Sequence, residues 1–235
     1  MTSSGYRERP ARPGLGLACT WTQSPAGGAK PYVQRVVPDG CMDLIWWERT
    51  GDIQVAGPDT GPHLAELVPG ERLVAVRFRP GMAPPVLGRP ADAVRDGRVP
   101  LRELWGVGAE ALSGALASAT DPERVLQDAV AGRMRPSDPI VPALVASLAG
   151  ATPVREAADR LGLSERQLRR RSLSAFGYPP KVLQRILRFQ EALSLARRGV
   201  PYAQVAAVAG YADQAHLARE TRDLAGVTIT ELLGR

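Results

Sequence analysis

The C-terminal part of the chain contains the same helical pattern twice. Each copy has a short apolar helix, a break that contains glycine, and a second short helix with basic and amide side chains on its outer face. The two copies are PVREAADRLGLSERQLRRR, which begins at Pro153, and PYAQVAAVAGYADQAHLARE, which begins at Pro201. A helix-turn-helix is the simplest supersecondary unit that fits both copies. The repeat therefore predicts two such units in this region.

The second helix of each copy has the right size to lie in a major groove of duplex DNA. Residues 155–198 hold 11 basic and 4 acidic side chains, which create the local field that a polyanion partner needs. Composition alone is explained more simply by a solvated, arginine-rich surface, so the repeated pattern decides the interpretation. We expect a sequence-specific DNA-binding protein that reads two adjacent major grooves with the helices at 164–176 and 213–224.

The remaining composition excludes several classes of protein. Cys19 and Cys41 are too few for a disulfide scaffold, and no CxxC spacing indicates a zinc or redox site. The N-terminus has no apolar segment typical of a signal peptide, and no run approaches the roughly 18 apolar residues that a membrane span needs. We expect a soluble protein of the cytoplasm.

The N-terminal half consists of short apolar runs interrupted by glycine and proline, which is typical of the strands of a β-sandwich or small barrel. In Leu73–Phe78 one face is apolar and the other is mixed, which predicts a half-buried strand. The runs are GLGLACTW, PYVQRVV, CMDLIWW, DIQVAG and RLVAVRF. Large side chains in these runs either line an apolar pocket or, as is commoner for strand aromatics, form the core. They are Trp21, Met42, Trp46 and Trp47.

The periodicity changes to that of helices after residue 81. Short helices or turns are expected near residues 83–87, 90–94 and 101–105, and longer helices at 109–119 and 122–134, the last with Asp121 as its N-cap. Proline and polar residues cluster at 135–139 and mark a boundary. The expected parts are a β-rich domain at 1–106, a helical connector at 107–135 and an all-α domain at 136–235.

Capping residues and glycines delimit the helices of the all-α domain. Thr152, Ser164 and Asp213 are the expected N-caps, and Gly199 closes the long central helix. The expected helices span residues 139–148, 154–161, 164–176, 180–198, 201–208 and 213–224, with a further short helix from Thr228.

In the second helix of the first unit, Leu168 is expected to point into the core. A rotation of 100° per residue then places its neighbours on the outside. Arginine can bind guanine O6 and N7 or clamp a phosphate, and glutamine can bind adenine edges. Because guanidinium groups on one short face repel each other, a negative partner is expected there. The candidate DNA-binding residues are Arg166, Gln167, Arg169 and Arg170.

In the second unit, Leu217 takes the inward position. Gln214 and Arg219 are candidates for contacts with bases or phosphates, whereas Ala215 can only meet a thymine methyl or leave space. His216 has no second ligand at metal spacing, so a hydrogen bond to DNA is expected there rather than zinc binding.

The helix between the units is expected to hold them together rigidly. Residues 181–198 would form a rod of roughly 27 Å at about 1.5 Å per residue, with a broad apolar stripe that can pack on both units. Successive major grooves on one face of DNA lie about 34 Å apart. One monomer can therefore present both helices to one duplex. Lys181 and Arg185, near the start of the rod, are candidates for phosphate contacts, with plain solvation as the alternative.

Several stretches of the C-terminal hundred residues carry a family resemblance. They are AADRLGLSERQLRR, RILRFQEAL, VAGYADQAHLARE and GVTITELL. Together they resemble the DNA-binding domain of AraC-type transcriptional regulators. The base-reading positions that this resemblance implies are Arg166, Arg169, Arg170, Gln214, Ala215, His216 and Arg219. Ser172 and Thr221 depart from the family pattern, which usually has an aromatic residue at both positions, so a loss of core volume is expected.

In the N-terminal half, VPDGCMDLIW, AGPDTG and VRFRPG resemble the sensor half of a subgroup of these regulators. Such halves are commonly cupin-like β-structures that bind an effector or dimerise, although fold analogy does not identify a ligand. The resemblance implies an α+β protein with a β-sandwich or barrel before the all-α domain. Its expected partners are double-stranded DNA, RNA polymerase, a small-molecule effector and a second copy of the chain. No cofactor and no membrane partner are expected.

The alternative function is DNA alkylation repair, since a reactive cysteine beside an AraC-type domain is a known combination. Cys41 would then be the acceptor, but a metal-activated thiolate needs further cysteine ligands and only Cys19 is available. An enzyme is not expected, because the sequence has no Ser/His/Asp set, no recognisable paired-carboxylate motif and no phosphate-binding glycine loop. His63 alone cannot form the metal site of a cupin enzyme.

Overall fold

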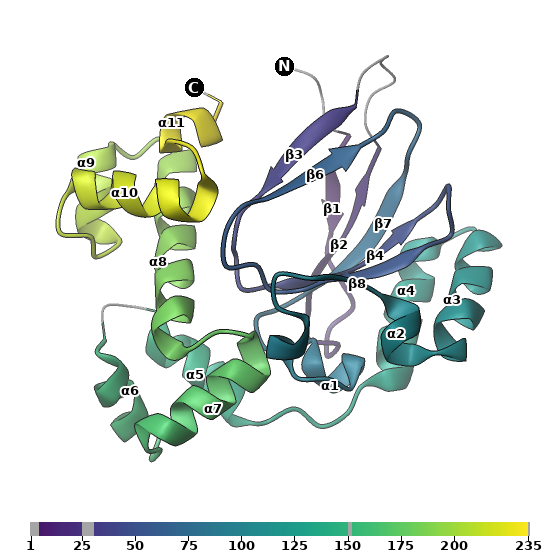
Figure 1. The fold of residues 1–235 in the computed structure, drawn as a ribbon, viewed down its shortest axis with the longest axis horizontal. Helices are drawn as coiled ribbons and strands as arrows, with labels where there is room; N and C mark the ends of the chain where they lie inside the picture. Colours follow the sequence, from purple (N-terminus) through teal and green to yellow (C-terminus); the bar gives the residue numbers. More distant parts are fainter. Residues whose placement is uncertain (1–4, 25–30, 150–151, 235) are drawn as a thin grey trace.

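The computed structural model describes residues 5–24, 31–149 and 152–234. Strands with a set of helices form one lobe and helices alone form the other, and the two lobes lie side by side (Figure 1). The expected α+β organisation, with an N-terminal β domain and a C-terminal all-α domain, is confirmed. In the described part of the chain, no helix is long and apolar enough to cross a membrane.

The N-terminal domain contains two antiparallel sheets. The main sheet has the strand order β1-β2-β7-β4-β5-β8, and β3 pairs with β6 in a separate sheet. The strands are β1 (Arg7–Arg9), β2 (Leu17–Gln23), β3 (Tyr32–Val36), β4 (Met42–Trp47), β5 (Ile53–Ala56), β6 (His63–Leu67), β7 (Leu73–Phe78) and β8 (Arg98–Pro100). Each predicted apolar run contains a strand. The runs do not predict β1, β6 and β8, which are short or polar and are stabilised by pairing with a neighbouring strand.

The central strand β7 is buried on both faces, so the prediction of a half-buried strand is wrong. Val74 and Val76 belong to the main core of the domain. Leu73 and Ala75 belong to a second apolar cluster on the opposite face, together with Leu67 of β6. The cause is tertiary, because helix α4 (Pro122–Arg133) covers one face of β7 and the β3–β6 sheet covers the other.

The helices of the N-terminal domain lie near the expected positions. The carboxylate of Asp121 caps α4 by accepting a hydrogen bond from the Arg124 backbone N–H at 3.1 Å, as predicted. The other helices are α1 (Pro84–Leu87), the 3-10 helix η1 (Ala91–Val94), α2 (Leu101–Trp105) and α3 (Val107–Ala117). Side chains of α3 and α4 share the main core with the sheet, so these helices pack as part of the N-terminal domain.

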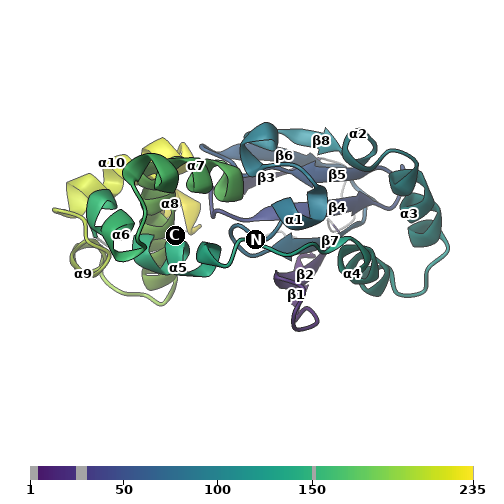
Figure 2. The ribbon, with the colours of Figure 1, turned by 90° about the horizontal axis from the view of Figure 1, so that it is seen from below.

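The C-terminal domain is arranged around the long central helix α8 (Figures 1 and 2). All helices from α5 to α11 contribute buried side chains to one apolar core, which therefore joins both predicted units. The helices are α5 (Ile140–Leu148), α6 (Val154–Arg160), α7 (Glu165–Phe176), α8 (Pro180–Arg197), α9 (Tyr202–Val208), α10 (Gln214–Ala225) and α11 (Ile229–Leu232). Helices α5 to α10 agree with the predicted helices to within two residues at either end, and α11 begins one residue after the predicted start at Thr228.

Two of the three N-caps predicted in the C-terminal domain are confirmed. Ser164 Oγ accepts from the Gln167 N–H at 3.3 Å, and Asp213 Oδ1 accepts from the His216 N–H at 2.6 Å. Thr152 is not the N-cap of α6, because the cap position is Pro153, which has no side-chain cap hydrogen bond. The fixed φ of proline suits the entry to a helix without such a bond, and Thr152 lies one residue too early.

The two positions that depart from the family pattern are filled by satisfied polar side chains. Ser172 and Thr221 are completely buried. The Ser172 hydroxyl donates to the Tyr178 carbonyl oxygen at 2.7 Å, and the Thr221 hydroxyl donates to the Leu217 carbonyl oxygen at 2.8 Å. A buried hydroxyl with a partner avoids the cost of an unsatisfied polar group. The loss of aromatic volume is therefore not accompanied by unpaired hydroxyls at these positions.

Candidate nucleic-acid interface

The first helix-turn-helix unit consists of α6 and α7. Leu168 is 0% exposed and packs in the core, which confirms its predicted inward position. Arg166, Arg169 and Arg170 are exposed on the opposite side of α7. None of the three forms an ion pair with a carboxylate within the described residues. Their positive charges therefore face solvent without a protein counter-ion.

Gln167 is exposed as predicted, but its side chain already has a structural role. Its Oε1 accepts hydrogen bonds from the backbone N–H and the hydroxyl of Ser164, both at 2.9 Å. Together with the bond from Gln167 N–H to Ser164 Oγ, this forms a capping box at the start of α7. The sequence contains the signature of a capping box, because Ser164 stands three residues before Gln167 at the start of the predicted helix. Gln167 can contact DNA only through the donors of its amide.

The second unit consists of α9 and α10. Leu217 is 1% exposed, which confirms its inward position, and Gln214, Ala215 and Arg219 are exposed on α10. The side chain of His216 is half-buried.

The imidazole of His216 is oriented by the protein itself. Its Nδ1 accepts a hydrogen bond from the backbone N–H of Ala212 at 3.3 Å, and the ring packs edge-on against Tyr211 with a centroid distance of 5.1 Å. Because Nδ1 is the acceptor, the proton of the neutral ring lies on Nε2. The sequence predicts the exposure of this helix face but not the contact with Tyr211.

Helix α7 lies at the start of α8, α10 crosses α8 farther along, and both lie on the same side of α8 (Figures 1 and 2). The central helix has 18 residues, or roughly 27 Å at about 1.5 Å per residue. Its buried side chains, which include Leu183, Phe189 and Leu193, contribute to the core of both units. The predicted rod between the units is therefore present.

The structure gives Arg185 a different role from the predicted phosphate contact. Its guanidinium binds the buried carboxylate of Glu220 at 3.1 Å and the exposed carboxylate of Asp223 at 3.6 Å, so it joins α8 to α10. Arg188 also binds Glu220, at 2.7 Å, and lies over the ring of Tyr211 at 4.5 Å from its centroid. The sequence does not predict this cluster, because its paired members are 23 to 38 positions apart and only the tertiary packing against α8 brings them together.

Lys181 is exposed on the first turn of α8, and its ammonium group lies 3.5 Å from Gln184 Oε1. No carboxylate pairs with it within the described ranges. The phosphate contact predicted for Lys181 remains compatible with its position.

Alanine substitution separates these two roles. We expect Arg185→Ala to lower the free energy of unfolding by about 1–2 kcal/mol, because Glu220 loses one of its two charge partners in a nearly buried position. We expect Lys181→Ala to leave stability unchanged and to reduce the slope of log K against log salt by about 0.9, the value for one phosphate contact. Urea unfolding and DNA titrations at several salt concentrations measure both. If Arg185→Ala instead left stability unchanged and reduced the salt slope, Arg185 would be a phosphate contact.

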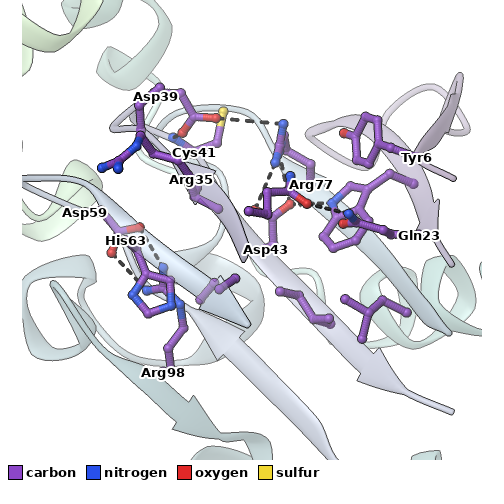
Figure 3. Close-up of a pocket in the computed structure, with 18 of the residues that line it drawn as sticks. Tyr6, Gln23, Arg35, Asp39, Cys41, Asp43, Asp59, His63, Arg77 and Arg98 are labelled. Atoms are coloured by element: carbon purple, nitrogen blue, oxygen red, sulfur yellow. Dashed lines mark hydrogen bonds and ion pairs between the residues drawn. The ribbon is translucent and has the colours of Figure 1, made fainter. Parts of the chain in front are cut away.

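A cavity of about 560 Å³ lies in the N-terminal domain between the main sheet and the β3–β6 sheet, next to α8 (Figure 3). The three motifs that resemble a sensor half all contribute side chains to it. Asp39, Cys41 and Asp43 come from VPDGCMDLIW, Asp59 from AGPDTG and Arg77 from VRFRPG. Since these motifs are separated in the chain, the cavity is a feature that only the fold assembles.

The tryptophans of the N-terminal half divide between the cavity and the core. Trp21 and Trp47 line the cavity, whereas Trp46 and Met42 are buried in the main core on the other side of the sheet. Adjacent residues of a strand point to opposite faces, which explains why Trp46 and Trp47 differ. Of the two predicted roles for these large side chains, Trp21 and Trp47 line a pocket, and Trp46 and Met42 form part of the core.

Ion pairs form between side chains that line the cavity. The Arg77 guanidinium binds Asp43 at 3.0 Å and lies 3.8 Å from Asp39, and Trp21 Nε1–H donates to Asp43 Oδ1 at 2.8 Å. Arg98 binds Asp59 at 2.7 Å. Figure 3 shows these groups together on the cavity surface. The cavity therefore offers carboxylate and guanidinium groups in fixed positions beside apolar aromatic rings.

Burial controls the protonation of the polar groups in the cavity. It raises the pKa of Asp39, and it raises the pKa of Cys41 well above its ordinary value, with the charge of Asp39 as a further cause. For His63, burial and the charge of Arg98 lower the pKa. At neutral pH the Cys41 thiol is therefore protonated, and the His63 imidazole is uncharged.

The protonated thiol disfavours the alkylation-repair alternative, because the thiolate is the nucleophile and the metal ligand. Within the described residues, no group of three or more His, Cys, Asp or Glu side chains could hold a metal ion. Cys41 thus has neither an activating metal site in this part of the chain nor a lowered pKa.

Two family models match the chain. A helix-turn-helix domain matches residues 157–235, and a domain of unknown function (DUF6597) matches residues 16–100. None of the curated proteins matches the chain. The first match covers α7, α8, α9, α10 and α11 with most of α6, and the second covers the strands that surround the cavity except β1.

Among solved structures, the chain is similar to ToxT from Vibrio cholerae, with 12% identity over 87% of this chain and 97% of ToxT and a TM-score of 0.46. ToxT bound to an unsaturated fatty acid has 12% identity over 87% of this chain and 94% of its own chain, with a TM-score of 0.46. ToxT bound to (E)-4-(8-methylnaphthalen-1-yl)but-3-enoic acid has 12% identity over 87% of this chain and 98% of its own chain, with a TM-score of 0.47. These values describe a distant likeness, and the bound molecules are properties of ToxT.

The helix-turn-helix match falls on the two units whose outer faces carry the arginines described above. It agrees with the resemblance that the sequence motifs indicate, and the N-terminal domain has the expected antiparallel β-structure. The C-terminal region is therefore an AraC-type helix-turn-helix domain.

Proposed function

We propose that this protein is a transcription regulator that reads two adjacent major grooves on one face of a duplex with its recognition helices α7 and α10, and that a small molecule in the N-terminal cavity modulates this binding. One observation carries the proposal. The second helices of both units lie on the same side of α8, at different positions along it, and present exposed polar faces. The length of α8, roughly 27 Å, approaches the groove repeat of about 34 Å.

The two recognition helices have different charges and therefore different proposed roles. The α7 face carries the cations Arg166, Arg169 and Arg170, which suit guanine and phosphate. On α10 the only exposed cation in the N-terminal half of the helix is Arg219, and the exposed Gln214 is neutral. The first unit then supplies more of the affinity, and the second unit tolerates more sequence variation. His216 donates through Nε2 to an acceptor on DNA.

The cavity supports the proposed effector site by its chemistry. A volume of about 560 Å³ lies within the range typical of small-molecule sites, which are mainly apolar with a few placed polar groups. Trp21 and Trp47 supply apolar area, and Asp39, Asp43 and Arg77 supply fixed hydrogen-bonding groups. RNA polymerase and a second copy of the chain stay as predicted partners.

Selection of bound fragments from random duplexes with the full chain tests this function. We expect a motif of two parts whose centres lie about 10–10.5 base pairs apart, because that is one helical turn. Repeating the selection with Arg169→Ala and with Gln214→Ala should relax one part each and leave the other part intact. A motif with a single part would contradict reading by both helices, and no enrichment would contradict specific binding altogether.

A further inference from the structure

Both recognition helices end against the N-terminal domain. An arginine of that domain donates to a carbonyl at each end: Arg95 Nη1 to the Gly177 oxygen after α7 at 3.0 Å, and Arg35 Nη1 to the Ala225 oxygen of α10 at 2.9 Å. The last carbonyls of a helix have no partner within the helix and carry the negative end of its dipole. Each guanidinium therefore holds the C-terminal end of one recognition helix.

The domains also meet along α8 and beside α7. Gln190 Nε2, on α8, donates to the Pro38 carbonyl oxygen at 2.6 Å, and the Tyr178 hydroxyl donates to the Asp59 carbonyl oxygen at 2.6 Å. Helix α7 packs against η1. We call the four hydrogen bonds from Arg35, Arg95, Gln190 and Tyr178 the interdomain joint. It contacts both recognition helices and the helix between them.

The joint does not cover the proposed DNA-binding faces. Arg166 and Arg169, near the start of α7, and Gln214 and Ala215, near the start of α10, are all exposed. The N-terminal domain thus holds the C-terminal ends of the two helices and leaves their N-terminal halves accessible. An arrangement of this kind fixes the helices relative to one another without competing with DNA.

The cavity adjoins the interdomain joint. Three of the four hydrogen bonds in the joint involve residues that line the cavity. Arg35 takes part in the first, Pro38 and Gln190 form the second, and Asp59 takes part in the third. In Figure 3, Arg35, Asp39 and Asp59 occupy the same end of the cavity. A molecule that occupies this end of the cavity therefore lies beside residues that hold α10, α8 and the end of α7.

We propose that the N-terminal domain is a brace that sets the separation and orientation of α7 and α10, with Arg35 and Arg95 as positioning residues, and that occupancy of the cavity controls the brace. This inference rests on the proposed reading of two grooves. Holding both helices in the arrangement that fits DNA reduces the ordering cost of binding. The cavity and the DNA-binding faces are then coupled, and each ligand changes the affinity for the other by the same factor.

The test compares the full chain with the Arg35→Ala/Arg95→Ala variant on three duplexes from the selection: the two-part site, one half-site alone, and the two-part site with about 5 base pairs, or half a turn, added between its parts. We expect the variant to bind the two-part site about tenfold more weakly, within the usual range of coupled equilibria. Its affinity for the half-site should equal that of the parent. It should also discriminate less between the two spacings, which a general loss of folding would not produce.

The matched control is Arg72→Ala/Arg124→Ala, which removes two arginines of the N-terminal domain remote from the joint. The side chain of Arg72 is 40% exposed and forms one ion pair, as does that of Arg95. The control should bind all three duplexes as the parent does. Unchanged spacing discrimination in Arg35→Ala/Arg95→Ala, or tighter binding to the two-part site, would overturn the brace.

Control by the cavity is tested separately with Ala65→Trp, which fills the cavity from β6, against Ala115→Trp on the exposed face of α3. We expect only Ala65→Trp to lower the ratio of two-part to half-site affinity. The same ratio in both variants would show that the cavity does not control the brace.

If the parent itself selects no two-part site, the proposed function fails. If the parent does so and the variants match it, only the brace fails.

Discussion

Replacing Arg166, Arg169 and Arg170 together by alanine is expected to weaken binding to the selected DNA by about 100-fold or more. A bidentate contact from one side chain to a base contributes about 1–3 kcal/mol, and a tenfold change in affinity corresponds to about 1.4 kcal/mol. The three arginines are exposed and have no carboxylate partner within the described part of the chain, so their removal leaves no buried group unpaired. Affinity titrations at several salt concentrations measure the loss, and the salt slope should fall by about 0.9 for each phosphate contact.

A control with the same change in net charge separates local contacts from general attraction. Arg7, Arg102 and Arg124 are exposed arginines of the N-terminal domain. Their triple alanine variant should keep the affinity of the parent to within about threefold, because charges beyond a Debye length of about 8 Å are largely screened at physiological salt. An equal loss in both triple variants would show that α7 contributes only bulk charge. The proposed recognition by this helix would then be wrong.

Phe189→Ala is expected to lower the free energy of unfolding by about 3–5 kcal/mol, the usual cost of removing a fully buried phenylalanine. Phe189 is 0% exposed in α8 and belongs to the same core as Leu168 and Leu217, the inward residues of the two recognition helices. The resulting cavity therefore weakens the attachment of both units to the central helix. Chemical unfolding followed by circular dichroism measures the change, and the midpoint of thermal unfolding should fall by on the order of 10 °C.

Val208→Ala is the control in the same domain, since Val208 is 60% exposed on α9. A surface substitution of this kind should change stability by no more than about 0.5 kcal/mol. Phe189→Leu, which keeps most of the buried volume, should fall between the two. If Phe189→Ala unfolds at the same denaturant concentration as the parent, α8 does not provide a core that both units share.

The C-terminal domain could be predicted from the sequence almost residue by residue because its signals are local. Ser164 and Asp213 cap the helices that follow them, and Leu168 and Leu217 define the inward faces by helical periodicity. The exposure of the arginines on α7 follows from that periodicity. The role of Arg185 does not, because Glu220 approaches it only after α10 has packed on α8.

The N-terminal domain shows where local signals are insufficient. An apolar run identifies a strand, but it does not specify what covers each face, so the second buried face of β7 could not be predicted. Short polar strands such as β1 and β8 have too few residues for a period-two pattern, and pairing alone establishes them. The cavity combines residues from motifs that are far apart in the chain.

The sequence by itself determined the two helix-turn-helix units, their inward leucines and the cationic face of α7, because hydrophobic periodicity and capping act over a few residues. Only the tertiary structure decided that Arg35 and Arg95 hold the ends of α10 and α7 and that the cavity adjoins this joint. The physical reason is distance along the chain. Arg35 and Ala225 are 190 positions apart, and no local preference encodes a hydrogen bond between them.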